Sequence, residues 1–182
     1  MTAAPRRWAA ELLYFWFAEL GPADWWGGSE AVDAKVARRF AGDLMALGTR
    51  PAREFLRDRL VARAAILLFD QVPRNVFRED RRAYAWDPMA LQIARGFIAR
   101  GWHRTLSGDA RAFVGMPLMH SEAIADQRAS LVYFRGLPES FAFARAHWRM
   151  IARFGRFPHR NPVLGRRSSK AERAAVAAGN AW

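Results

Sequence analysis

The chain has 182 residues, enough for one domain of ordinary size whose core needs no disulfide or metal. Hydrophobic residues make up 52% of it, which excludes a chain that is disordered throughout, and the lack of cysteine excludes disulfides, thiolate metal sites and cysteine nucleophiles. The formal net charge is +12, and residues 144–182 hold nine basic residues but only one acidic residue, Glu172.

The apolar segments are short. The longest runs, Leu12–Ala18 and Ala64–Phe69, fall far below the roughly 20 residues that a membrane-spanning helix requires. No export signal is visible near the N-terminus, where Glu11 and Glu19 interrupt the apolar stretch. These observations predict a cytoplasmic protein without a membrane partner.

Helical periodicity runs through almost the whole chain, and no alternating run suggests a strand. Apolar residues recur every three or four positions, and glycines and prolines separate the segments. Pro117 lies inside one of them and is expected to kink or split it. We expect about eight helices, over residues 8–20, 29–47, 51–69, 87–100, 107–119, 124–135, 138–154 and from 169 onward.

The predicted fold is therefore all-α, an irregular helical bundle or array. We expect a single domain over residues 1–182, with a weakly packed basic segment at 166–182. Ser169 and Glu172 have the spacing of a capping box, which predicts a short helix within that segment.

Polar motifs interrupt the apolar background at three places. They read DQVPRN at 70–75, MPLMHSE at 116–122 and RFGRFPHRN at 153–161. A weaker aromatic motif, Phe15-Trp16-Phe17 followed by Trp25-Trp26, fits a core better than a cofactor site.

With these three strings the chain resembles the bacterial family known as domain of unknown function 924, from about Glu11 to Glu172. The resemblance implies a TPR-like helical fold. It brings no activity, because the function of that family is unassigned.

The first motif offers two interpretations. Asp70 and Arg74 stand four residues apart, so on a continuing helix they share a face and can pair. Asp70 is then a candidate catalytic base and Arg74, with Asn75, a candidate ligand anchor. The alternative is a structural ion pair at the turn around Pro73.

The second motif places His120 two residues before Glu122. We assign both as candidate catalytic residues. A metal site needs three or four ligands, and two positions of a helix spaced by two face different sides, so we predict no metal and no cofactor. Ser121 fits a helix N-cap better than a nucleophile, because no nucleophile-elbow motif surrounds it.

The third motif is a dense cationic loop. His159 completes the set of candidate catalytic residues, and arginine binds phosphate or carboxylate in a bidentate way. The alternative is that these arginines neutralise the carboxylates of Asp70, Glu122 and Asp126. The candidate ligand-binding residues of this loop are Arg153, Arg156, Arg160 and Asn161.

Three functions follow, in order of preference. The first is a polar pocket for an anionic or phosphorylated small molecule, formed where the three motifs converge. The second is a TPR-like module that binds a protein partner. The third, weak nucleic-acid binding through the basic C-terminal region, ranks last because no nucleic-acid motif is present. The sequence leaves open whether the protein is an enzyme.

Overall fold

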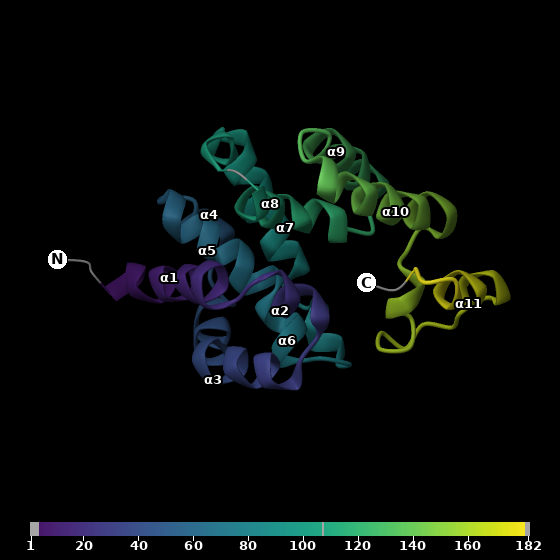
Figure 1. The fold of residues 1–182 in the computed structure, drawn as a ribbon, viewed down its shortest axis with the longest axis horizontal. Helices are drawn as coiled ribbons and strands as arrows, with labels where there is room; N and C mark the ends of the chain where they lie inside the picture. The colour runs from purple at the N-terminus through teal and green to yellow at the C-terminus, as the bar shows by residue number, and fades with distance from the viewer. Residues whose placement is uncertain (1–3, 107, 181–182) are drawn as a thin grey trace. The chain divides into compact units, whose positions relative to one another are not determined.

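The fold is entirely helical in the part of the chain that the structure, a computed structural model, describes, residues 4–106 and 108–180. These residues form eleven α-helices, three short 3₁₀ turns and one π-helical turn, without a strand (Figure 1). The predicted all-α class is confirmed. The TPR-like arrangement stays a prediction.

The additional helices are short. Two of them, α2 (Pro22–Gly27) and α6 (Val72–Val76), consist of one or two turns and carry too little periodicity to be found in the sequence. The third arises where one expected helix is divided into α4 (Ala52–Phe55) and α5 (Arg59–Asp70). Asp58 has an extended backbone there, and its side chain accepts a 3.0 Å hydrogen bond from the backbone N–H of Val61. This N-cap starts a new helix instead of continuing the old one.

The chain divides into two compact units, and the boundary between Val114 and Gly115 falls within α8. The first unit is centred on α5, whose residues 64–70 are all buried and which packs against α1 and α7. Its other elements are α1 (Ala4–Tyr14), the π turn η1 (Phe15–Glu19), α3 (Glu30–Leu47), η2 (Arg81–Tyr84), α7 (Asp87–Ala99) and η3 (Trp102–Thr105).

The second unit contains the end of α8 (Gly108–His120) and the packed pair α9 (Ile124–Phe134) and α10 (Pro138–Phe154). The 3₁₀ turn η4 (Pro158–Arg160) and α11 (Lys170–Ala177) complete it. One cluster of buried residues links α10, the residue before η4, and α11. Its members are Met150, Ile151, Phe157 and Ala175. The single domain over residues 1–182 stays a prediction.

Pro117 does not split α8, which continues to His120. The expected start of this helix, Ser107, lies outside the described residues. Among the helices described, none is both long and apolar enough to cross a membrane.

Candidate functional site

The DQVPRN motif lies in the first unit, where α5 ends and α6 begins. Arg74 forms an ion pair with Asp70 at 3.6 Å and donates a close hydrogen bond to its carbonyl oxygen. The same guanidinium reaches Asp87 at 3.0 Å. Burial alone lowers the pKa of Arg74, but Asp70 and Asp87 outweigh it and raise that pKa. The pairing expected from the sequence is confirmed.

Two further residues of this motif, Pro73 and Asn75, shape the backbone between the helices. Pro73 occupies the first turn of α6, where its missing N–H is tolerated, so it begins a helix after α5 has ended at Asp70. The Asn75 amide donates to the carbonyl of Gln71 at 3.0 Å. The proline and the Asn75 hydrogen bond together fix the turn between the two helices.

The loop after α8 is closed by side chains of α9. Gln127, which is fully buried, donates to the carbonyls of Met119 and Ser121 at 2.6 and 2.7 Å. The hydroxyl of Ser121 donates to Asp126 at 2.7 Å. Ser121 is therefore not the N-cap of α9, a position that Ala123 occupies without a side-chain bond. The loop places His120 and Glu122 beside the third motif.

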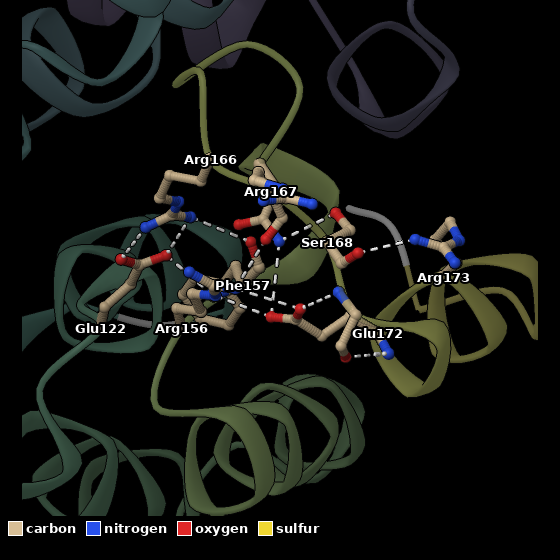
Figure 2. Close-up of polar contacts among 10 residues, drawn as sticks. Glu122, Arg156, Phe157, Arg166, Arg167, Ser168, Glu172 and Arg173 are labelled. Atoms are coloured by element: carbon tan, nitrogen blue, oxygen red, sulfur yellow. Dashed lines mark hydrogen bonds and ion pairs between the residues drawn. The ribbon is translucent and has the colours of Figure 1, made fainter.

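Glu122 binds two parts of the third motif at once. Arg166 donates to both of its carboxylate oxygens, at 2.7 and 2.9 Å, and the backbone N–H of Phe157 donates at 2.8 Å (Figure 2). Burial raises the pKa of Glu122, but the bonds from Arg166 and Phe157 outweigh burial and hold that pKa below its usual value. The carboxylate is therefore ionised and fully engaged at neutral pH.

Glu172 of α11 is the second carboxylate of this network. Arg156 donates to it at 2.7 and 3.1 Å, and the N–H of Ser169 donates at 2.7 Å (Figure 2). The amide of Asn161 donates to Ser168 at 3.1 Å and lies 3.4 Å from Glu172. The side-chain bond from Arg156 and the Ser169 N–H lower the pKa of Glu172 to about 2. The expected capping box is present and anchors α11 to the cationic loop.

Three histidines lie close together, two of them against the buried ring of Phe157. The rings of His120 and His147 lie 6.1 Å apart, and those of His147 and His159 lie 5.4 and 5.7 Å from Phe157. His147 is only 5% exposed, and its Nδ1 contacts the carbonyl of Phe143 at 2.9 Å. A carbonyl only accepts, so Nδ1 carries the proton. We call these residues, with Arg160, the histidine cluster.

Arg160 brings a permanent positive charge to the histidine cluster. It is 6% exposed, and its guanidinium carbon lies 4.6 Å from the centre of the Phe157 ring. Burial lowers the pKa of His147 to about 3, and the positive charges of His120, Arg160 and His159 contribute to this shift. The surroundings of His147 are thus both dry and electropositive.

The structure brings the second and third motifs together inside the second unit, including His120, Glu122, Arg156 and His159. Arg153 is exposed and covers Phe154 at 4.9 Å, away from any carboxylate of this network. The first motif belongs to the other unit, so the convergence of Asp70 and Arg74 with the histidine cluster stays a prediction.

Sequence reasoning missed two members of the site. His147 lies on the inward stripe of α10 with Ala144 and Ile151, three and four residues away, and this spacing was the available signal. Arg166, rather than Arg156, neutralises Glu122, and nothing in the spacing of the two arginines distinguishes them. Among the residues described, no three histidine or acidic side chains are grouped as a metal site requires.

The comparisons agree with the motifs. The model of the family described as bacterial protein of unknown function (DUF924) matches residues 12–180. The chain belongs to this family. A solved structure, that of a protein of unknown function from Agrobacterium tumefaciens, is similar to this DUF924 chain, with 35% identity and a TM-score of 0.88. The similarity covers 94% of this chain and 97% of that one. No curated protein matches.

Proposed function

We propose that the second unit binds a small anionic molecule, through a phosphate or carboxylate group, at His120, His159 and Arg160. The observation that supports this most directly is the histidine cluster itself. Two imidazoles and a buried guanidinium lie against one phenylalanine ring, and a third imidazole, that of His120, lies beside His147. The positive charge of His120, Arg160 and His159 adds to burial in depressing the pKa of His147.

The chemistry of the cluster supports an anion. Glu122 faces Arg166 directly and also lies in the field of Arg160, and Glu172 is bound by Arg156. Arg160 is a buried guanidinium beside Phe157, and its charge acts on His147. A guanidinium donates charge-assisted hydrogen bonds to a phosphate or carboxylate, and it can do so through two N–H groups at once.

The three histidines have different roles in the proposed site. His147 stays neutral and carries its proton on Nδ1, so it positions its neighbours. His120 and His159 are partly exposed and so within reach of a ligand, and imidazole is a common proton carrier, so these two have that role if the site is catalytic. Glu122 is a positioning residue in this proposal, because an ionised carboxylate with a low pKa holds the loop but is a poor acid. Arg156 and Asn161 support α11.

The test is a titration with inorganic phosphate at low ionic strength, followed by the imidazole resonances of the four histidines and by the melting temperature. Phosphate should shift His120 and His159 but not His103 of the first unit. At ten times its Kd it should stabilise the protein by about 1.4 kcal/mol.

Arg160→Met removes the charge while keeping an apolar side chain against Phe157, and it should abolish both responses. Arg149→Met, at an exposed position of α10, removes the same charge outside the histidine cluster and should leave them intact. If the Arg160 variant does not fold, His159→Gln serves in its place. Equal responses in the Arg160 and Arg149 variants would reduce the effect to general attraction by a basic protein, and the proposal would fail.

A further inference from the structure

The first unit contains a π-helical turn directly after α1. In the turn η1, the N–H of Leu20 bonds to the carbonyl of Phe15 at 3.0 Å, five residues back. Such turns are rare, because they widen the helix at an energetic cost, and they are found frequently at functional sites. This one carries Trp16 and Phe17.

These two rings belong to an aromatic cluster centred on Phe113. Four rings lie within 5.2 to 5.7 Å of Phe113, those of Trp16, Phe17, Trp25 and Trp26. Phe113 is buried, whereas Trp26 is 60% exposed although it stacks on Phe113 at an angle of 5°. A core alone does not require a tryptophan with most of its surface in water.

The Phe113 cluster also holds two hydrogen-bond donors without acceptors. Trp16 is 2% exposed, and its indole N–H meets no partner among residues 4–106 and 108–180. The Nε of Arg63 is likewise buried and without an acceptor in that part of the chain. By contrast, the indole N–H of Trp25 donates to the carbonyl of Trp16 at 3.0 Å. Buried donors are nearly always satisfied, so two in one cluster require an explanation.

Arg63 brings a positive charge that no described carboxylate neutralises through an ion pair. It lies on α5, next to Ala62 and Ala64, and its guanidinium carbon is 4.5 Å from the centre of the Phe17 ring. Burial lowers the pKa of Arg63, and the charge of Arg59 one turn earlier lowers it further. A half-buried cation beside another cation favours an anion from outside the chain.

We propose that the Phe113 cluster binds a planar aromatic molecule that carries a carboxylate. The carboxylate accepts from the guanidinium of Arg63 and from the indole N–H of Trp16, which supplies both missing acceptors. The ring of the ligand packs against the indole of Trp26, whose exposed side chain shifts from Phe113 to admit it. This site lies wholly within the first unit and does not rest on the function proposed for the histidine cluster.

Benzoate is the probe, and the indole N–H resonances of the eight tryptophans are the readout in the ¹H–¹⁵N spectrum. We expect saturable shifts of Trp16 and Trp26. Benzamide has the same ring without the charge and should bind at least about tenfold more weakly, because a neutral amide cannot form an ion pair with Arg63. Inorganic phosphate, an anion without a ring, should leave Trp26 unchanged.

Arg63→Met should weaken benzoate binding at least about tenfold. Arg59→Met is the matched control. It removes an equal charge one turn away, where Arg59 donates to Thr105 at 2.9 Å, and it should retain binding. Trp26→Ala, at an exposed ring, provides a second variant that tests stacking if the Arg63 variant fails to fold.

Three results would overturn the proposal. They are equal benzoate affinity in the wild type and the Arg63 variant, equal affinity for benzamide and benzoate, and no saturable shift up to about 10 mM benzoate.

Discussion

Arginine has two distinct environments in this protein. Arg74, Arg156 and Arg166 each face a carboxylate that is itself buried or half-buried, so each removes the cost of leaving that acid without a partner. Arg63 instead lies over a phenylalanine ring. A ring face compensates a guanidinium only in part. An external anion therefore stabilises Arg63 more than it stabilises an arginine that already faces a carboxylate.

Titration of His147 should control how the protein responds to acid. Its folded pKa of about 3 lies below the 6.5 of an unperturbed imidazole, so the unfolded state takes up the proton first. Its contribution to stability is fully present above pH 6.5 and is lost as the pH falls toward 3. The total loss is roughly 5 kcal/mol.

Urea unfolding at a series of pH values measures this effect. His147→Phe keeps a ring of similar size and removes the titration, so the variant should lose less stability than the wild type between pH 7 and pH 4. An imidazole of His147 that is protonated at pH 5 in the wild type would contradict the expectation.

Helix packing in the second unit depends on one glycine. A Cβ atom on Gly115 of α8 would lie 2.4 Å from Tyr133 and 2.8 Å from Phe134, both rings of α9. The two helices approach each other there only because glycine has no side chain. Rigid aromatic rings give way less easily than aliphatic chains.

Gly115→Ala should therefore destabilise the protein by about 1–3 kcal/mol, as overpacking of a core does. Gly42→Ala is its control, because Gly42 lies in the middle of α3 with no atom within 4 Å of a Cβ at that position. There the gain in helix propensity should stabilise the protein by roughly 0.5–1 kcal/mol. Thermal unfolding of both variants gives the comparison. If both changes have the same sign, the close approach of α8 and α9 has no energetic consequence.

At the scale of the whole molecule, the net charge is +12, and some of the arginines that contribute to it form ion pairs within the chain. Glu122 and Glu172 each bind one arginine of the basic C-terminal region, whereas Arg145, Arg149 and Arg173 of that region remain on the surface. Scattered surface arginines attract the phosphate groups of nucleic acid but do not distinguish one base sequence from another.

We therefore expect weak, unspecific binding to DNA that falls steeply as salt rises from about 50 to 200 mM. Fluorescence anisotropy with a labelled duplex, and with unrelated competitor sequences, measures it. A preference for one sequence that persists at the higher salt would show that nucleic acid is a specific partner.

The sequence by itself determined the all-α class, the family and the local features that depend on neighbours along the chain. The Asp70–Arg74 pair and the Ser169–Glu172 capping box follow from spacings of four and three residues, because one helical turn brings such positions together. The order of the residues along the chain is sufficient to predict local geometry of this kind.

Only the tertiary structure decided which distant groups meet. Glu122 lies 44 positions from Arg166 and 35 from Phe157, and many arginines could have satisfied it equally well on charge alone. The histidine cluster depends on the packing of α8, α10 and η4 around Phe157, and the Phe113 cluster depends on the π turn after α1. Coulomb attraction and burial favour such contacts but do not determine which residue is the partner. Shape complementarity between packed helices determines which residues meet.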